Sequence, residues 1–454
     1  MVTADGMSTK AIAVQLLAVL CASISGISNG MQAGWTAPVL PLLEKPDSTI
    51  DITETDVVWL ESILWIGSIV GLPLTVVMLN KFGSKISTLI AAVENLVAWI
   101  LIACATSKEF LYVGRLLGGI GSNNAFVSTP IYIAEITDKR IRGFFGTFTY
   151  TTMLMGLIVV YSVAPFVSLP ISSAVGALFL VIQLLTFPFM PDTPYYLLLK
   201  GKKDKARKSL QFVRASEDVG KELDEIGVAI ERQKNEPGRC IDLCTVKSNR
   251  KGVIIMTILN FTQHFSGISV TFMNIHSILE DAVFLSPNLS AILFAVLMLL
   301  SALCASVVVD KIGRKLILGS SCFLTAVCLF LMAVYFTLEH LEIKVQSYNW
   351  VLSSTMMLYA ICFKFGIGLI PIVMTAEIFP SNVKAFGVTI ADVMYVTFGF
   401  ISIQLYQFLK HHYGIHVPFY IFGCCCLGTG LFSVFYIPET KGKTLEEIQM
   451  ILKS

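Results

Sequence analysis

Long apolar runs recur along the whole chain and are separated by short polar segments. A helix that crosses the hydrocarbon core of a bilayer needs roughly twenty apolar residues, and twelve runs of this kind can be traced. They lie near 11–31, 57–79, 86–106, 109–134, 145–168 and 170–190, and then near 252–280, 288–309, 316–338, 350–376, 385–409 and 416–437. The pattern predicts an all-α membrane protein with twelve transmembrane helices.

One hydrophilic stretch divides the runs into two sets of six. Residues 200–251 alternate Lys and Arg with Asp and Glu, which is typical of amphipathic helices on a membrane surface. We expect two such helices, around 202–214 and 218–235. The predicted organisation is therefore an N-terminal six-helix bundle (1–199), a linker (200–251), a C-terminal six-helix bundle (252–440) and a tail (441–454).

Composition supports a membrane protein over a soluble one. Aliphatic, aromatic and sulfur residues make up 55% of the 454 positions and charged residues only 14%, which leaves too little polar surface for a soluble fold of this size. The lipid bilayer is thus an expected partner. The net charge of +2 implies neither nucleic acid nor an acidic partner.

The distribution of basic residues predicts the orientation of the chain. Most of the 33 Lys and Arg residues fall in the linker, the tail and the loops on the same side as the termini. Because basic segments stay in the cytoplasm during insertion, both termini and the linker are expected to be cytoplasmic, with the plasma membrane as the expected location. The opposite loops hold few basic residues, namely Lys45, Lys108, Lys344 and Lys410.

The two halves repeat the same loop patterns in the same order. The basic loop at 80–85 is matched by the one at 310–315, and the segment 191–194 by 438–441. An acidic residue also stands seven positions before a basic one in each half, as Glu135 before Arg142 and Glu377 before Lys384. A single match would follow from topology alone, but three in order indicate a duplication. Duplicated carriers place their binding site where the repeats meet, near the membrane midplane.

The motifs in these loops identify a family. They are Gly114-Arg115 with Gly118-Gly119, Pro130-Ile-Tyr-Ile-Ala-Glu135 with Arg142-Gly143, and Pro438-Glu-Thr-Lys-Gly-Lys-Thr-Leu-Glu-Glu447. In these motifs the chain resembles the sugar porter family of the major facilitator superfamily, and especially the insect facilitated trehalose and glucose transporters. This resemblance covers nearly the whole chain and implies transport of a small sugar by alternating access between two six-helix bundles.

A set of charged residues at helix ends is a candidate gate. Carboxylates and guanidinium groups there can pair across neighbouring helices; each exposed pair contributes about 1 kcal/mol or less, but several together can favour one of two packings. A plain positive-inside topology would also place basic residues there. Asn80 and Ser84 stand where the family usually has an acidic and a basic residue, so we expect the N-terminal half of the gate to be weaker. The predicted gating residues are Arg115, Glu135, Arg142, Asp310, Arg314, Glu377, Lys384 and Glu439.

The seventh apolar run carries a polar stripe that is a candidate sugar site. On a regular helix with 100° per residue, its amides and hydroxyls fall on one face. Amides suit sugars because each offers donors and an acceptor to neutral hydroxyl groups, and aromatic rings on other helices, Phe272 among them, can complete the site. The alternative is that these polar groups bond helix to helix without a ligand. The predicted substrate-binding residues are Asn260, Gln263, His264, Thr271, Asn274, Trp65, Tyr150 and Tyr395.

The candidate pocket departs from the family pattern. Gln263 matches the helix-7 glutamine of the family, but His264 stands at the second glutamine, Ser269 at the following asparagine, and Tyr150 at the glutamine of helix 5. The usual proline and tryptophan of helix 10 are replaced as well, while Gly366, Gly368 and Pro371 interrupt that helix and permit either a gating bend or a static kink.

Three further points complete the functional prediction. Helix 1 has no acidic residue between Ala11 and Gly34, the place where coupled family members often carry one, so uniport is expected. The alternatives are proton-coupled transport and transport of another small polar solute, which the charged residues Asp392 and Lys364 would support. A non-transporting sugar sensor is the other alternative. An enzyme is not expected, and no cofactor is expected, because metal-ligand spacings, phosphate loops and nucleophile motifs do not stand out.

Overall fold

The computed structural model of the chain describes residues 8–45, 50–138, 140–235, 239–279, 286–343, 348–380, 383–441, 443 and 445–453. Every regular element assigned in these ranges is a helix. The all-α fold expected from the apolar runs is therefore confirmed for this part of the chain.

The chain packs as two units. Unit 1 comprises residues 1–32, 49–51 and 66–236, and unit 2 comprises residues 33–48, 52–65 and 237–454. The first and third helices are each divided between the units, because their segments 33–34 and 54–65 belong to unit 2.

Unit 1 is built from the first part of the chain. Its helices are most of α1 (Thr9–Gly34) and of α3 (Glu54–Ala103), then α4 (Lys108–Ile136), α5 (Arg142–Gly146), α6 (Phe148–Val163), α7 (Leu169–Thr186), α8 (Pro194–Leu199), α9 (Lys203–Arg214) and α10 (Gly220–Asn235). The 3-10 turns Ala164–Phe166 and Phe187–Phe189 extend α6 and α7.

Unit 2 contains α2 and the helices that follow the linker. They are α2 (Thr36–Leu43), α11 (Asp242–Thr245), α12 (Lys247–Phe265), α13 (Ile268–Ile278), α14 (Pro287–Ile312), α15 (Arg314–His340), α16 (Asn349–Phe365), α17 (Ile370–Ile378), α18 (Lys384–Tyr413), α19 (His416–Tyr436) and α20 (Leu445–Lys453).

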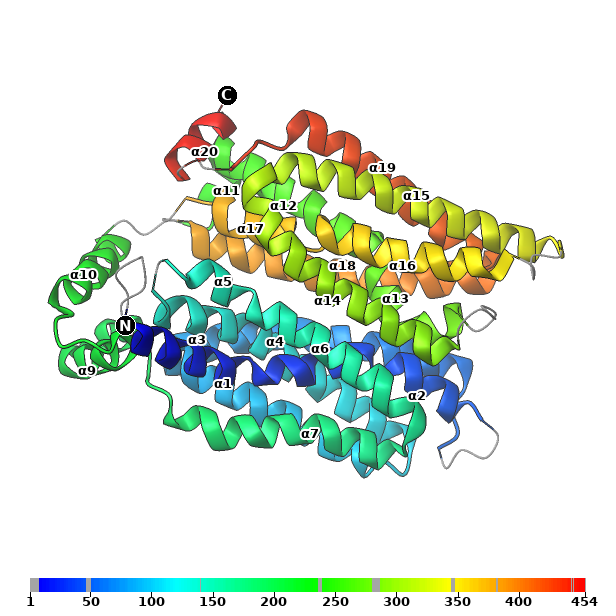
Figure 1. The fold of residues 1–454 in the computed structure, drawn as a ribbon, viewed down its shortest axis with the longest axis horizontal. Helices are drawn as coiled ribbons and strands as arrows, with labels where there is room; N and C mark the ends of the chain where they lie inside the picture. The colour runs from blue at the N-terminus through cyan, green and yellow to red at the C-terminus, as the bar shows by residue number, and fades with distance from the viewer. Residues whose placement is uncertain are drawn as a thin grey trace. The chain divides into compact units, whose positions relative to one another are not determined.

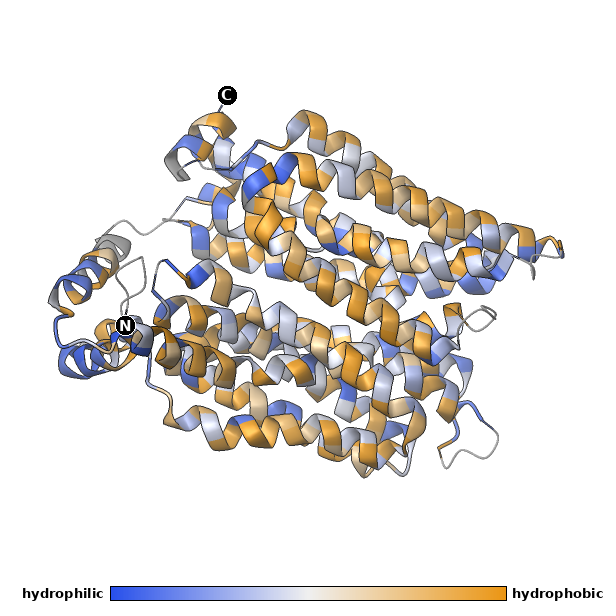
Figure 2. Cartoon of the chain, viewed as in Figure 1, coloured by the Kyte–Doolittle hydropathy of each residue, from blue (hydrophilic) through white to orange (hydrophobic). Residues whose placement is uncertain are grey.

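Ten helical segments in the described ranges are long and apolar enough to cross a membrane. One of them is α3, whose 50 residues include a kink at Gly83 (φ 81°, ψ 172°), so that two helices follow each other there. Helix α4 has 29 residues but buries polar side chains such as Arg115, Asn123 and Asn124 inside unit 1. Apolar residues predominate along the long helices, whereas hydrophilic residues gather on α9 and α10 (Figure 2).

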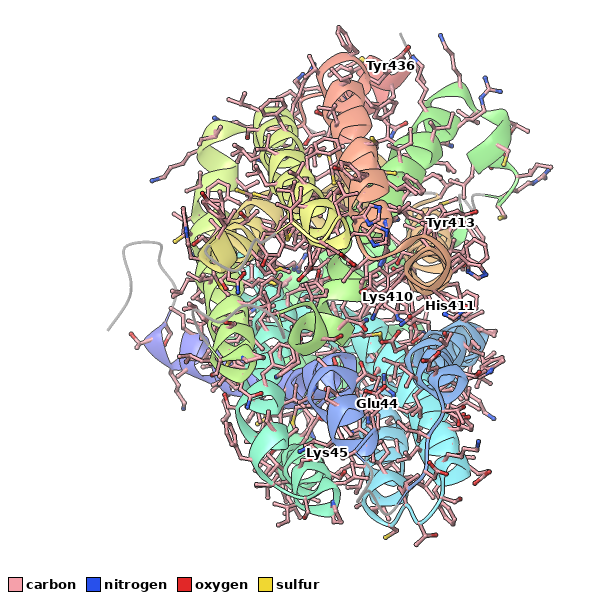
Figure 3. All side chains as sticks on the ribbon, turned by 90° about the vertical axis from the view of Figure 1, so that its right-hand side faces the viewer. Glu44, Lys45, Lys410, His411, Tyr413 and Tyr436 are labelled. Carbon is pink, nitrogen blue, oxygen red and sulfur yellow. The ribbon has the colours of Figure 1, made fainter. Side chains whose placement is uncertain are left out.

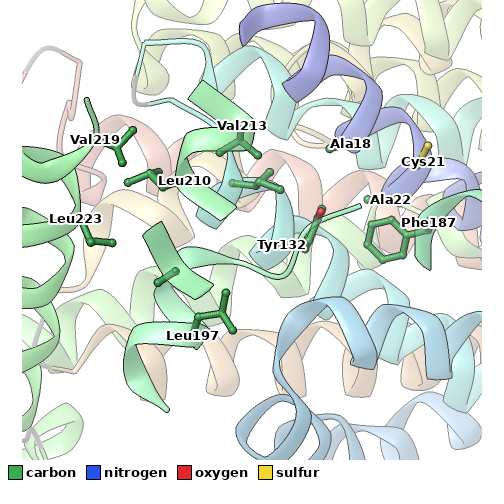
Figure 4. Packing of buried hydrophobic residues seen from close by; sticks show 12 residues of the cluster. Ala18, Cys21, Ala22, Tyr132, Phe187, Leu197, Leu210, Val213, Val219 and Leu223 are labelled. Carbon is green, nitrogen blue, oxygen red and sulfur yellow. The ribbon is translucent and has the colours of Figure 1, made fainter. Parts of the chain in front are cut away.

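The two linker helices of unit 1 lie at the end where α1 begins (Figure 1). Their apolar sides pack into one buried cluster with residues from α1, α4 and α8, including Ala18, Tyr132, Leu197 and Leu210 (Figure 4). Gln15 of α1 also donates a hydrogen bond to the carbonyl of Val213 in α9 (3.1 Å). The linker helices are thus packed onto unit 1 by a buried apolar face.

Unit 2 is held by long helix pairs. Helix α15 packs along α19, α12 along α18, and α2 against α13, while α20 lies against the beginning of α12. Charged and polar residues mark the helix ends, as with Lys410, His411 and Tyr413 at the end of α18 and Glu44 just after α2 (Figure 3).

Candidate functional site

The seventh apolar run is broken in the middle. Helix α12 ends at Phe265 and α13 begins at Ile268, because Gly267 adopts a left-handed backbone (φ 84°) that only glycine takes without strain. Tyr359 of α16 donates a hydrogen bond to the carbonyl of Ser266 (3.0 Å), which satisfies a group freed by the break. The assumption of one regular helix through this run was therefore wrong, since 100° per residue does not hold across Gly267.

Three members of the predicted polar stripe have protein partners. Asn260 donates to the carbonyl of Ala391 in α18 (3.1 Å), so its amide joins two helices. Thr271 and Asn274 donate to carbonyl groups one turn earlier in the chain, at Gly267 (2.9 Å) and Val270 (3.2 Å). For Asn260, the contact is the helix-to-helix bond that we kept as the alternative to ligand binding.

Gln263 and His264 differ from the rest of the stripe. Gln263 is 7% exposed, yet its side-chain amide makes no hydrogen bond to any described residue. The His264 ring bonds through Nδ1 to the hydroxyl of Ser269 (2.7 Å), while its buried Nε2 has no hydrogen-bond partner among the described residues. Buried polar groups are normally paired, so the unpaired His264 Nε2 is unusual, and both side chains retain unused hydrogen-bonding capacity.

Aromatic rings from α3 and α18 contact the His264 ring of α12, and all three residues belong to unit 2. The Trp65 ring from α3 stands at right angles to the imidazole with centroids 5.3 Å apart, and the Tyr395 ring from α18 lies 4.3 Å from it. The structure thus brings together three of the predicted site residues, Trp65, His264 and Tyr395. Tyr150, also a predicted site residue, lies in α6 of unit 1 edge-on to Phe126 (5.3 Å).

The tenth apolar run is also interrupted, as its glycines predict. Helix α16 ends at Phe365 and α17 begins at Ile370. Ser321 of α15 fixes the interruption, because its hydroxyl donates to the carbonyl of Cys362 (2.6 Å) and accepts the N–H of Ile367 (3.0 Å). Lys364 is buried beside this break and donates to the carbonyl of Gly368 (3.4 Å).

Three of the predicted gating residues of unit 2, Arg314, Glu377 and Glu439, form one bonded group. Arg314 pairs with Glu377 (2.9 Å), whose other carboxylate oxygen accepts the hydroxyl of Thr440 (2.6 Å). Glu439 accepts the backbone N–H groups of Arg314 (3.0 Å) and Lys315 (3.1 Å) and so caps the start of α15.

Electrostatics around this group follow from burial and neighbours. Burial alone would raise the pKa of Glu439, but the N–H groups that it accepts outweigh this effect and hold its pKa below the ordinary value. Burial lowers the pKa of Lys384, and the nearby Glu377 carboxylate opposes that shift. The side chain of Asp310, the remaining predicted gating residue of this half, lies outside the described part of the chain.

The gating residues of unit 1 are arranged differently. Glu135 accepts a hydrogen bond from the Ser84 hydroxyl (2.8 Å), where its counterpart Glu377 has an arginine partner. Arg142 donates to the carbonyl of Thr137 (3.3 Å). Arg115 is fully buried twenty residues before Glu135 in α4, roughly 30 Å along the helix, and donates to the carbonyl of Gln32 (2.5 Å). Arg115 therefore lies apart from the other gating residues of its unit.

Comparison with known families agrees with this arrangement. Residues 18–452 match the family described as sugar (and other) transporter. The chain belongs to this family. Membership confirms the predicted class of protein, a transporter rather than an enzyme, and accounts for the apolar helices of both units.

Members of the sugar transporter family from insects align with almost the whole chain. A facilitated trehalose transporter Tret1 of Apis mellifera ligustica is 29% identical over 442 residues, which cover 96% of this chain and 88% of that protein. Tret1 of Bombyx mori is 28% identical, with 97% of this chain and 87% of that protein covered. The resemblance to the insect facilitators is thus confirmed at the level of sequence.

Solved structures of sugar transporters share the fold. The proton:xylose symporter XylE of the major facilitator superfamily, bound to 6-bromo-6-deoxy-D-glucose, aligns with a TM-score of 0.77 at 22% identity and covers 98% of this chain and 99% of that chain. A partially occluded inward-open structure of XylE from E. coli aligns with a TM-score of 0.78, also at 22% identity, over 96% of this chain and 100% of that chain.

The transporter also has a charged group that sequence reasoning missed. Arg214, the last residue of α9, pairs with Glu222 of α10 (2.7 Å), donates to the carbonyl of Ile136 (3.0 Å) and lies 3.9 Å from Asp138. It therefore ties the linker helices to the end of α4. The signal available in the sequence was an arginine at the end of one amphipathic helix and a glutamate in the first turn of the next helix.

Proposed function

We propose that the protein is a facilitative transporter of a small sugar, working as a uniporter by alternating access. The observation that carries this proposal is the Gln263 side chain, which belongs to a residue only 7% exposed, makes no hydrogen bond to any described residue and lies next to the break between α12 and α13. A neutral amide with free donors and acceptor suits a neutral polyhydroxyl solute. Hydrogen bonding between helices, the alternative role, does not account for Gln263, because its side-chain amide makes no hydrogen bond to another described helix.

The proposed topology has twelve spans with both termini cytoplasmic. It counts α3 as two spans that meet at Gly83, adds α4, and takes α12 with α13 and α16 with α17 as one interrupted span each. Interrupted helices at membrane depth are typical of carriers, because the backbone groups freed there line a polar cavity. The basic loops support placing the linker helices α9 and α10 on the cytoplasmic face of the plasma membrane.

The proposed substrate group consists of Gln263 and His264 for hydrogen bonds and of Trp65 and Tyr395 for stacking. Asn260 we assign to holding α12 against α18, because its amide is occupied by Ala391. Glucose-like and trehalose-like sugars are the proposed substrates. The named relatives are trehalose facilitators, and their identity over nearly the full chain supports this choice.

Uptake by the purified chain in liposomes tests the proposal. Labelled glucose, trehalose, fructose and a polyol are supplied outside the vesicles, with and without a protonophore. We expect saturable uptake of at least one sugar. This uptake should stop when the sugar concentrations inside and outside the vesicles are equal, and the protonophore should not affect it. Binding of a sugar without any flux would instead support the sensor, and flux of none of the panel would reject sugar transport.

Proton-coupled transport remains a second candidate because of one residue. Asp392 of α18, three residues before Tyr395, makes no hydrogen bond and no ion pair with any residue in the described ranges. Carboxylates inside a membrane are costly and usually functional. A coupled carrier would accumulate sugar when a proton gradient is imposed, and Asp392→Asn would abolish that accumulation; a uniporter shows neither effect.

A further inference from the structure

The first turns of α3 are fastened to α18 by two hydrogen bonds. Gln407 donates to the carboxylate of Glu61 (2.5 Å), and Gln404 donates to the hydroxyl of Ser62. Glu61 is fully buried. Because Gln404 and Gln407 lie one turn apart in α18 and Glu61 and Ser62 are adjacent in α3, the two bonds fix both the distance and the register of these helices.

One turn further along α3, the Trp65 ring fits into a notch in α18. The notch is Gly399, where a methyl group would come within 2.5 Å of the Trp65 ring atoms Cε3 and Cη2. Real side chains do not approach so closely, so only glycine admits the indole at this position. The indole also stands against the rings of His264 and Tyr395, with centroids 5.3 Å and 6.3 Å away.

The closed arrangement leaves two ring nitrogens unsatisfied. Trp65 Nε1 and His264 Nε2 are both buried, and neither has a hydrogen-bond partner among the described residues. Burying such groups unpaired is unfavourable. The indole therefore stands against the imidazole at a cost in polar pairing, which is the condition expected of a side chain that moves aside for a hydrogen-bonding ligand.

Trp65 is the last residue of α3 that packs in unit 2. Residues 52–65 pack in unit 2, whereas from Ile66 onward α3 packs in unit 1. There Gly67 and Gly71 fit tightly against α4, because a methyl group added to each would lie 3.1 Å from Gly119 Cα and 3.1 Å from Ile120 Cα respectively. The helix is continuous through Trp65 and Ile66, so the residue in the notch is joined directly to the part of α3 that packs in unit 1.

We propose that Trp65 is the movable member of the substrate group, a removable lid beside His264 that is seated in the Gly399 notch and is released when the start of α3 leaves α18. The inference rests on the proposed function, because it assigns the lid to the same Gln263 and His264 site. It closes the site toward the face at which α3 begins, which the proposed topology places outside the cell. The Glu61–Gln407 and Ser62–Gln404 bonds hold the lid shut.

Filling the notch tests the lid without requiring transport. Gly399→Ala should unseat the indole, and hydroxyl-radical footprinting with mass spectrometry should then record several-fold faster oxidation of Tyr395 and His264. The matched control is Gly428→Ala in α19, where an added methyl meets nothing within 4 Å. Equal oxidation in the two alanine variants would overturn the proposal.

A second background separates a lid from general loosening. In Trp65→Ala the notch has no occupant, so adding Gly399→Ala should cause no further increase in oxidation. An equal increase in both backgrounds would mean that Gly399 acts through something other than the indole. Should Trp65→Ala fail to fold in a thermal scan, Trp65→Phe serves as the smaller lid and the same comparison applies.

Sided transport measurements then connect the lid to the carrier. Gly399→Ala should lower the half-saturation concentration for sugar offered at the α3-start face and raise it at the opposite face, because the open-lid state becomes more populated. A symmetrical change at both faces would contradict a lid. If no sugar is transported at all, the footprinting result still stands, so failure of the lid and failure of the proposed function give different results.

Discussion

Gln263 gives the sharpest test of the substrate site, through the variant Gln263→Ala. The Gln263 amide can donate two hydrogen bonds and accept at least one, and none of this capacity is used by the described residues. Each neutral hydrogen bond contributes about 0.5–1.5 kcal/mol net. Two such bonds to a sugar correspond to about 1–3 kcal/mol, or to a half-saturation concentration roughly 5-fold to 150-fold higher in the variant.

The assay is zero-trans uptake into proteoliposomes over a wide range of sugar concentrations. Gln183→Ala provides the matched control, because this glutamine is also fully buried but donates to the carbonyl of Ala22 (3.0 Å) and to Ser25 (3.3 Å). We expect the control to melt at a lower temperature with its half-saturation concentration unchanged. An unchanged half-saturation concentration in well-folded Gln263→Ala would refute the assignment of this amide to the substrate.

Three other substitutions have definite expected outcomes, and one of them is also tested by a change of pH. Gly267→Ala places a methyl 2.9 Å from Phe422 Cδ2 on a left-handed backbone, and should reduce transport by closing or straightening the break, measured as uptake per folded protein. Gly313→Ala (φ 111°) places a methyl 2.6 Å from Glu439 Oε2. Loss of the Glu439 cap and backbone strain should together lower the free energy of unfolding by about 2–4 kcal/mol. The melting temperature should therefore fall, whereas that of the control Gly428→Ala should stay unchanged. The same cap predicts a pH dependence. Since the pKa of Glu439 is depressed, the stabilisation that its carboxylate provides is present at neutral pH and is lost as the pH falls below about 4. The melting temperature of Gly313→Ala, which lacks the cap, should therefore fall less over that range than the melting temperature of the parent protein. For a uniporter, Asp392→Asn should leave uptake equally insensitive to an imposed proton gradient, and gradient-driven accumulation in the parent would contradict uniport.

The length of the apolar runs was sufficient to predict an all-α fold of long apolar helices, because burial in lipid requires such runs whatever the tertiary contacts. Both linker segments also contain helices, at α9 and α10, since their amphipathic pattern needs only one apolar surface to pack against. The same argument did not reveal that α12 ends at Phe265. Gly267 is compatible with a continuous helix at modest cost, and the left-handed backbone depends on Tyr359 and Phe422 from distant helices.

Which polar residues face a ligand was harder to predict than which are polar. Asn260 and Gln263 are one turn apart with the same amide group, yet only Asn260 finds a carbonyl, that of Ala391, within reach. That difference arises from the position of α18, which no local pattern encodes. The meeting of Trp65 with Gly399 has the same origin, because neither residue carries a signal of the other in the sequence.

Counterflow tests the central claim most directly, namely that one site takes up a sugar and delivers it to the other side. Vesicles containing the protein are loaded with unlabelled sugar and diluted into a trace of the labelled sugar. A carrier with an alternating site predicts a transient accumulation of label above its equilibrium level, abolished when Gln263 is replaced and the sugar is kept below its raised half-saturation concentration. A monotonic approach to equilibrium, or no entry of label, would contradict the account.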